Sequence, residues 1–175
     1  MTDEPATDAG GVECEGGEAP CFAHLFDQPA GESEAVLAQL VTELADAVVL
    51  ADADGRITFW NDAATRLLGF DGTEAIGQTL DLIIPERLRG RHWSGYREVM
   101  STGQTSYGDR LLEVPAVHRD GRSLSIAFTV TLLHRPDARR PFAIAAVIRD
   151  DTQRWQERRQ LKAEIADLQA NQATE

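Results

Sequence analysis

The sequence has only two cysteines, a single lysine and no long hydrophobic run. Uninterrupted apolar stretches such as Ala47–Ala51 are far too short to span a bilayer. No basic segment followed by an apolar one opens the chain, so we expect no secretory signal, no membrane anchor and a cytoplasmic location. No Lys or Arg precedes Arg56, and the net charge is −12. This acidic balance argues against nucleic-acid binding, which needs a basic surface.

The two cysteines lie close together near the start of the chain. Cys14, Cys21 and the nearby His24 could supply three ligands to zinc or iron. A fourth ligand is not apparent, and no paired Cys-x2-Cys motif is present. We therefore expect incidental thiols in a flexible tail rather than a metal site.

The chain is long enough for one domain with tails, and 42% of its residues are apolar, as in a globular protein. Residues 1–32 are acidic and offer almost nothing to bury, which predicts a disordered leader. Residues 33–46 keep helical spacing of apolar side chains and predict an amphipathic helix. The domain is predicted over residues 47–151, and a terminal helix over residues 152–175.

The domain begins with signals for a hairpin and a capped helix. Two β-rich runs, Val48–Ala51 and Arg56–Trp60, flank an Asp54-Gly55 turn, which predicts an antiparallel hairpin. Asn61 can cap a helix over Asp62–Leu68, and Gly69 can close it. One further helical turn is predicted over Thr73–Ile76.

A longer helix is expected to begin at Pro85, a residue suited to the first helical position. On this helix Leu88, His92, Tyr96 and Val99 fall on one face, so a histidine is set into an apolar stripe. His118 and His134 are predicted on the surface.

After Gly103 the pattern changes to period two, which is typical of strands. Strands are predicted over Tyr107–Val117, interrupted by Pro115, then over Ser123–Leu133 and over Phe142–Ile148. The order of elements predicts an α+β fold, an antiparallel sheet with helices on one face.

The chain resembles a PAS domain over about residues 35–155. The motifs that carry the resemblance are Asp54-Gly55-Arg56-Ile57, Trp60-Asn61-Asp62-Ala63-Ala64, Leu68-Gly69-Phe70, Gly77, Arg119-Asp120-Gly121-Arg122 and Arg149-Asp150-Asp151-Thr152. The resemblance implies a five-stranded antiparallel sheet with helices on one face and flanking N- and C-terminal helices. It also implies a sensory or dimerisation role, with the signal leaving through the helix after Asp150-Asp151-Thr152.

Within that family, Pro85–His92 is similar to the haem-ligand helix of the rhizobial oxygen-sensor kinases. The resemblance implies that His92 is the proximal ligand of a haem b iron, which leaves an open position for O2, CO or NO. The implied lining comprises Leu88, Tyr96, Val99, Arg110, Leu112, Ile126, Phe128 and Val130.

Two positions depart from those kinases. Leu112 falls where they carry an oxygen-contacting Arg, and Glu98 falls where they carry a propionate-contacting Arg. Arg110 lies two residues before Leu112, so we expect both on the same strand face, and it falls where related sensors place a distal methionine. Arg110 could supply a distal hydrogen bond or a propionate contact, and Leu112 an apolar distal wall. Arg91 or Arg97 could replace the missing propionate contact.

Two alternatives remain open. A PAS interaction module could lack any cofactor, with its cavity filled by side chains or by a small organic ligand, and His92 would then be an ordinary core histidine. A haem enzyme such as a peroxidase is a third class, although no motif predicts catalytic residues.

The terminal helix carries Leu161, Ile165 and Leu168 at 4-then-3 spacing, a short coiled-coil seam. So short a helix is marginal alone, and we expect it to pair in a homodimer through the terminal helices. The sequence ends there, so we expect output through an effector protein in trans.

Overall fold

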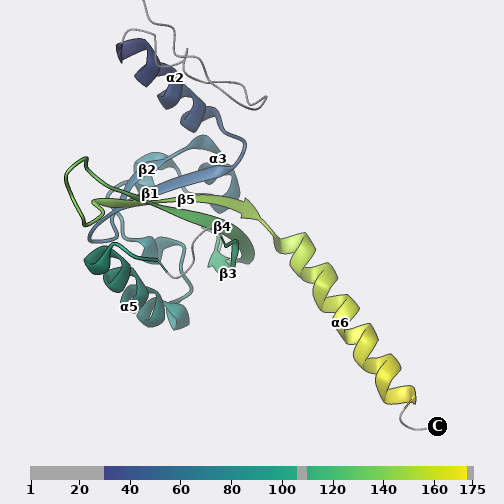
Figure 1. Ribbon diagram of the computed structural model, residues 1–175. Helices are drawn as coiled ribbons and strands as arrows, with labels where there is room; N and C mark the ends of the chain where they lie inside the picture. The colour runs from purple at the N-terminus through teal and green to yellow at the C-terminus, as the bar shows by residue number, and fades with distance from the viewer. Residues whose placement is uncertain (1–29, 106–109, 173–175) are drawn as a thin grey trace, which may run out of the picture. The chain divides into compact units, whose positions relative to one another are not determined.

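The computed structural model describes residues 30–105 and 110–172. The chain divides into two units, residues 1–38 and 39–175, and the second holds the whole sheet. The described elements, labelled in Figure 1, are α2 (Ala30–Glu43), β1 (Ala47–Asp52), β2 (Ile57–Trp60), α3 (Asp62–Leu68), α4 (Gly72–Ala75), a 3-10 turn η1 (Leu80–Leu82), α5 (Glu86–Thr102), β3 (Leu112–Val117), β4 (Ser123–Leu133), β5 (Ala143–Asp150) and α6 (Thr152–Gln172).

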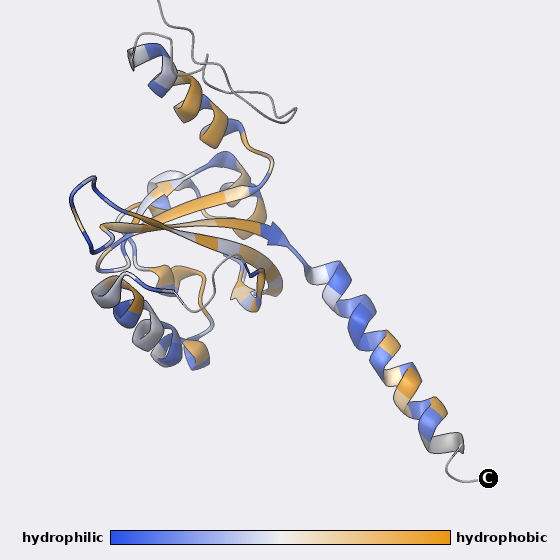
Figure 2. Ribbon diagram, viewed as in Figure 1, coloured by the Kyte–Doolittle hydropathy of each residue, from blue (hydrophilic) through white to orange (hydrophobic). Residues whose placement is uncertain are grey.

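The five strands form one antiparallel sheet in the order β2-β1-β5-β4-β3. This confirms the predicted fold class. The long strand β4 has the predicted bounds, because its strict alternation of apolar and small polar residues leaves one register that buries the apolar set. Figure 2 shows hydrophobic residues along the strands, whereas the apolar residues of α6 come mainly in its C-terminal half.

The hairpin between β1 and β2 forms as predicted. Its turn places Gly55 at φ 76°, a conformation that favours glycine. The Asp52 carboxylate accepts hydrogen bonds from the backbone N–H groups of Asp54 and Arg56, at 3.0 and 2.9 Å. The turn is therefore fixed by local chemistry that the sequence displays.

The main core lies between one face of the sheet and helices α3 and α4. It joins buried residues of α3 with inward-facing residues of β1, β4 and β5, and Leu68 and Ala64 have no exposed surface. Helix α3 is capped by Asn61, whose side chain accepts from the Ala64 N–H at 2.9 Å, and it ends at Gly69 with φ 81°. Both caps are as predicted.

Several predicted boundaries were wrong. Of the strand predicted over Tyr107–Val117, residues 107–109 lie outside the described residues, residues 110–111 are not in a strand, and pairing with β4 begins at Leu112, opposite Phe128. Pro115 does not interrupt β3, since β3 is an edge strand and an edge tolerates a residue without an N–H. Pro85 is the N-cap of α5 rather than its first residue. Strand β5 starts one residue later and ends two residues later than predicted.

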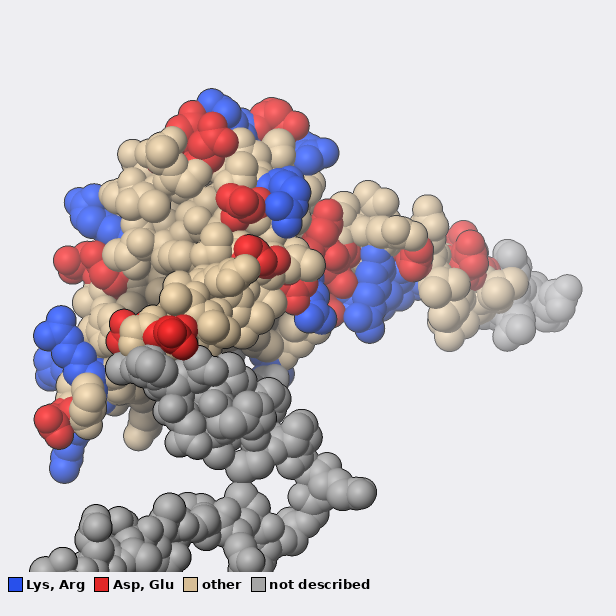
Figure 3. All heavy atoms as spheres, turned by 90° about the horizontal axis from the view of Figure 1, so that it is seen from above, with Lys and Arg blue, Asp and Glu red and all other residues tan. Residues whose placement is uncertain are grey.

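The helix predicted over residues 33–46 is α2, which begins at Ala30 and ends at Glu43. Most of the predicted leader, including Cys14, Cys21 and His24, lies outside the described residues. In the face seen in Figure 3, acidic and basic side chains alternate over the surface, with other residues between them. None of the described helices has both the length and the apolar character that crossing a bilayer requires.

Candidate functional site

Helix α5 is fastened to the rest of the domain by aromatic side chains beside His92. The Trp93 indole N–H donates to the Asp81 carboxylate at 2.8 Å, and the Tyr96 hydroxyl donates to the Asp52 carbonyl at 2.5 Å. The Trp93 ring lies directly over Gly55, where a Cβ would overlap it. These contacts fix α5 against η1 and the β1–β2 turn.

The second apolar cluster of the domain contains Tyr96 and Met100 of α5, together with Ala51 of β1. Ile144 of β5 packs against this cluster and is the cross-strand partner of Ala51. Cross-strand partners share one face of a sheet, so α5 covers the face that carries Ala51 and Ile144. In Figure 1, α5 lies beneath the sheet.

His92 is half-buried between the rings of its neighbours. Its ring centroid lies 4.9 Å from that of Trp93 and 5.7 Å from that of Tyr96. Its Nδ1 atom is the one buried side-chain polar atom among the described residues that has no hydrogen-bond partner. A buried polar atom without a partner costs free energy, about 1–3 kcal/mol, and such atoms are uncommon in folded proteins.

Burial lowers the pKa of His92 from its ordinary value of 6.5, and the nearby Asp81 carboxylate opposes this only in part. At neutral pH the imidazole is therefore uncharged. A neutral imidazole has a free nitrogen lone pair, which is the form that binds a metal.

The sheet face that α5 covers continues into a set of apolar side chains that we call the apolar wall. Its members are cross-strand neighbours: Leu112 pairs with Phe128, Val114 with Ile126, and Val130 with Ala146. Val49 of β1 pairs with Ala146 as well, which places the wall on the same face as Ala51. The wall comprises Leu112, Val114, Ile126, Phe128, Val130 and Ala146.

Burial differs across this face of the sheet. Ile126 is buried in the main core, whereas Phe128 and Val130 are only half-buried. Leu112, Val114 and Ala146 are half-buried too. Toward β3 the wall is therefore an apolar surface that α5 and its own neighbours cover incompletely.

The remaining predicted site residues divide between α5 and the start of β3. Leu88 and Val99 are half-buried on α5, and Tyr96 is buried. Arg110 is exposed and precedes the first residue of β3. The prediction that it shares a strand face with Leu112 was therefore wrong. Leu112 is half-buried and belongs to the wall.

The side chains considered for propionate contact, Arg91, Arg97 and Glu98, are all exposed on α5. His134 is exposed as predicted. The surface prediction for His118 was wrong: its side chain is 14% exposed, its ring lies against Gly69, and its Nδ1 is 3.0 Å from the Asp120 carboxylate.

Two glycines in α5 leave open space beside the helix. Gly95 is one turn from His92, and neither Gly95 nor Gly90 would place a Cβ within 4 Å of another part of the protein. Glycine inside a helix costs about 1 kcal/mol relative to alanine. Gly95 therefore leaves room for a close approach to α5 on the side of the helix that carries His92.

Sequence reasoning missed the polar contacts of Asp81. The Asp81 carboxylate accepts a hydrogen bond from Trp93 and lies 3.5 Å from Nε of Arg89. The Nη2 atom of Arg89 donates to the Asp81 carbonyl at 2.9 Å. The one available signal was the spacing of Arg89 and Trp93, which places both on one face of a helix. Nothing in the sequence indicated that Asp81 would meet them.

The junction between the sheet and α6 is held by side chains of both. The Asp151 N–H donates to the Ser125 carbonyl at 2.8 Å, and the Ser125 N–H donates to the Thr152 hydroxyl at 3.0 Å. Arg158 donates to the Asp151 carboxylate and to Glu113 of β3, each at 2.8 Å. The first two turns of α6 are thus tied to both β3 and β4.

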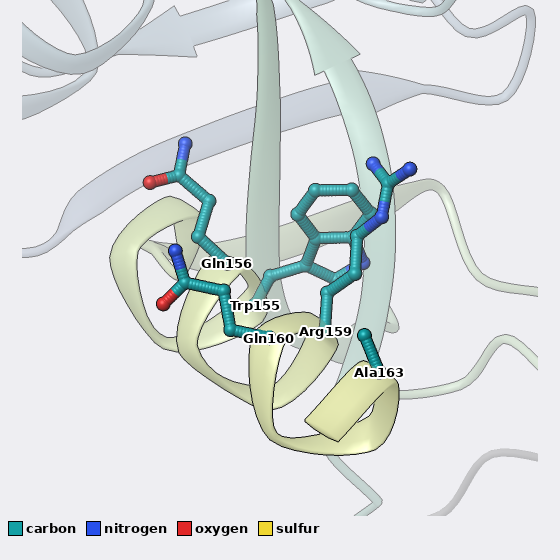
Figure 4. Close-up of a pocket in the computed structure, with 5 residues that line it drawn as sticks. All are labelled: Trp155, Gln156, Arg159, Gln160 and Ala163. Atoms are coloured by element: carbon teal, nitrogen blue, oxygen red, sulfur yellow. The ribbon is translucent and has the colours of Figure 1, made fainter. Parts of the chain in front are cut away.

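Two surface hollows lie at α6, and His92 lines neither of them. One is lined by residues of α6 alone, and in it the Arg159 guanidinium lies 5.4 Å above the centre of the Trp155 ring (Figure 4). The other lies where α6 leaves the sheet, between Ala127, Asp151 and Glu157 among others. Neither hollow includes a predicted site residue.

The residues at His92 fit a haem in their chemistry. An iron porphyrin needs one axial ligand from the protein and apolar surroundings. His92 offers an uncharged imidazole with an unpartnered buried nitrogen, and the apolar wall lies on the covered side of the sheet. The described residues hold no group of three His, Cys, Asp or Glu side chains that could bind a bare metal ion.

Comparison with known proteins agrees with this architecture. An uncharacterized protein of Azorhizobium caulinodans is 34% identical over 131 residues, which are 74% of this chain and 17% of that protein. The sensor protein FixL of Bradyrhizobium diazoefficiens is 37% identical over 59 residues, which are 34% of this chain and 12% of FixL. The chain thus spans less than a fifth of either relative.

Among solved structures, the PAS domain of the protein from Colwellia psychrerythraea superposes with a TM-score of 0.60 at 21% identity, covering 69% of this chain and 98% of that domain. A family model described as the PAS fold matches residues 35–150, about two thirds of the sequence. The chain therefore belongs to the PAS family.

Proposed function

We propose that this chain is a PAS sensor and signalling domain that binds haem b through His92 and responds to a diatomic gas or to the redox state of the iron. The observation that carries the proposal is the half-buried, uncharged imidazole whose Nδ1 lacks a partner. The partial similarity to a protein named as a sensor supports the same reading. When bound, haem supplies an iron with one open axial position for O2, CO or NO.

The chain's own residues would hold and shield that group. His92 would ligate the iron, and the rings of Trp93 and Tyr96 limit how far the imidazole can turn. The apolar wall would exclude water and lower the local dielectric, which tunes the iron. Gly95 leaves space for a flat ring close to α5.

Signal transmission is proposed to run through the contacts described above. Trp93 and Tyr96 connect the histidine to the β1–β2 turn, and Asp151, Thr152 and Arg158 connect the sheet to α6. A displacement of the strands beside the wall would therefore reach α6 without any intervening flexible segment among these residues.

We propose that output requires a homodimer formed through the terminal helices and an effector protein in trans. Leu161, Ile165 and Leu168 of α6 are 57%, 54% and 62% exposed, and a seam so exposed gains stability when a second helix covers it. No catalytic role is proposed.

A second candidate is a PAS interaction module without haem. One observation favours it: the two hollows described above lie at α6, and His92 lines neither of them. In that case the apolar wall would contact a small organic ligand or be covered by side chains of the protein alone.

The two candidates differ in colour. The full chain is expressed with a haem supply, and hemin is titrated into wild type, His92→Ala and the control His134→Ala, which alters an exposed histidine. A Soret band in wild type and His134→Ala, lost or shifted in His92→Ala, supports the haem sensor. A wild type that gains no Soret band refutes haem binding and leaves the cofactor-free module.

A further inference from the structure

The loop between β4 and β5 carries three exposed arginines close together. It comprises residues 134–142, which we call the arginine loop, and it projects beyond the ends of the two strands (Figure 1). Arg135, Arg139 and Arg140 are exposed, and Asp137 is the one acidic residue of the loop. In a chain whose net charge is −12, this loop is a local concentration of positive charge.

The charges of the arginine loop are not neutralised by neighbouring carboxylates. Elsewhere in the described residues, ion pairs engage Arg89, Arg119, Arg122, Arg149 and Arg158. None of the ion pairs found in residues 30–105 and 110–172 includes a residue of the loop. The Arg135 guanidinium instead lies 5.8 Å from the centre of the Phe142 ring, a contact that orients it without neutralising it. The loop therefore presents cations that can bind carboxylates of another molecule.

The base of the arginine loop is fixed to the rest of the domain. The Phe142 N–H donates to the Leu133 carbonyl at 2.9 Å, and Pro141 is buried. Gly103 ends α5 against the loop, since a Cβ at Gly103 would lie 2.7 Å from the Arg139 carbonyl oxygen. A surface that is held in place before binding loses less conformational entropy when a partner arrives.

The side chains of the loop indicate the chemistry of a partner. A guanidinium binds a carboxylate through two parallel hydrogen bonds. Phe142 is 45% exposed beside Arg135, so an apolar contact is available next to the cations. A chain with a net charge of −12 repels a long polyanion such as a nucleic acid, whereas a short acidic segment can meet the loop alone. The loop thus fits a short segment that is rich in Asp and Glu and includes an apolar side chain.

We propose that the arginine loop is a docking surface for an acidic segment of another protein. Arg135, Arg139 and Arg140 bind its carboxylates, and Phe142 contacts an apolar side chain of the same segment. Docking at this loop is independent of haem binding. It rests on the output in trans proposed above only in that the effector protein would carry the acidic segment.

The test measures binding of the full chain to a fluorescein-labelled peptide of ten glutamates by fluorescence anisotropy. Wild type is compared with the triple variant R135Q/R139Q/R140Q. The matched control R66Q/R87Q/R154Q removes three exposed arginines from other elements and produces the same net charge. An exposed ion pair changes binding by up to about fivefold, so the loop variant should bind about tenfold more weakly and the control should stay within about twofold of wild type. Added NaCl should weaken binding to wild type.

A second pair of peptides tests the apolar contact. In one peptide three of the ten glutamates are replaced by leucine, and in the other the same three are replaced by glycine. Wild type should bind the leucine peptide more tightly than the glycine peptide, and Phe142→Ala should remove this difference. Binding of the ten-glutamate peptide to Phe142→Ala should stay within about twofold of wild type, because the three cations remain.

The contrary results are distinct from one another. No binding of the ten-glutamate peptide to wild type at low salt, or equal weakening in the loop variant and the control, would overturn the inference. Tighter binding of a ten-nucleotide polyuridylate through the same three arginines would assign the loop to nucleic acid instead. Self-association that is lost in the loop variant and kept in the control, measured by sedimentation, would assign it to a second copy of this chain. None of these results bears on haem binding, which the Soret band measures separately, and circular dichroism establishes that the loop variant keeps its fold.

Discussion

Replacement of Asn61 by Ala is expected to destabilise the domain more than any surface substitution. The Asn61 side chain is 2% exposed and makes four hydrogen bonds. Its oxygen accepts from the N–H groups of Val48 and Ala64, both at 2.9 Å. Its nitrogen donates to the carbonyls of Val41 and Asp46, at 3.2 and 3.1 Å. One amide therefore joins the start of β1, the first turn of α3, the last turn of α2 and the segment that follows α2.

The size of the expected destabilisation follows from the backbone groups that lose their hydrogen bonds to Asn61. Losing an N-cap costs about 1 kcal/mol, and leaving the buried Val48 N–H without a partner costs about 1–3 kcal/mol. With a smaller loss at the two carbonyls, Asn61→Ala should lower the free energy of unfolding by about 3–5 kcal/mol. That is a large share of the stability of an ordinary domain.

Urea unfolding of the full chain, followed by circular dichroism, measures this change. Arg66→Ala is the matched control, because Arg66 is exposed on the same helix, and its effect should stay within about 0.5 kcal/mol. A loss below about 1 kcal/mol in Asn61→Ala would contradict the network described around this residue.

Three other perturbations have definite expected outcomes. Gly55→Ala should destabilise the domain by clearly more than Gly77→Ala in thermal melts: both residues have positive φ, but only at Gly55 would a Cβ overlap the Trp93 ring. Arg158→Ala should speed amide hydrogen exchange in the first turns of α6, because it removes the ties to β3 and to the Asp151 carboxylate. Because the pKa of His92 is lowered in the folded protein, the unfolded chain binds a proton at His92 at a higher pH than the folded chain does. The free energy of unfolding of the haem-free protein should therefore fall as the pH drops below about 6.5, and His92→Gln should reduce this dependence.

Each of these has its own control and contrary result. For α6 the control is Arg154→Ala, which removes an exposed cation from the same helix. Equal amide hydrogen exchange in Arg154→Ala and Arg158→Ala would mean that the contacts of Arg158 with Glu113 and Asp151 do not hold α6 to the sheet. Equal melting temperatures for the two glycine variants would contradict the packing of Trp93 on the turn. An unchanged pH dependence in His92→Gln would mean that another group causes the loss of stability.

The parts of the fold that could be predicted are those fixed by neighbours in sequence. Asp54-Gly55 dictates a tight turn, Asn61 caps the helix that begins at the next residue by accepting from the Ala64 N–H, and the alternation of Ser123–Leu133 allows one register. Each of these signals acts over fewer than a dozen residues. The bounds that they predict are close to those observed.

The contacts that could not be predicted join distant segments. Arg158 meets Glu113 across 45 positions, and Trp93 meets Asp81 and Gly55 only once α5 has docked. Arg110 was wrongly assigned to the face of Leu112, because the spacing of two residues counts only within a strand and β3 begins at Leu112. The candidate site was therefore predictable on α5, where helical spacing sets the face, and less so on the sheet.

The central claim, that His92 is the axial ligand of a haem iron, is tested most directly by chemical rescue. His92→Gly is loaded with haem and its absorption spectrum is recorded without and with imidazole, beside wild type. We expect the variant to lose the wild-type Soret position and to regain it when imidazole occupies the vacated place. A His92→Gly spectrum identical to wild type without imidazole would contradict the claim and move the ligand elsewhere in the chain.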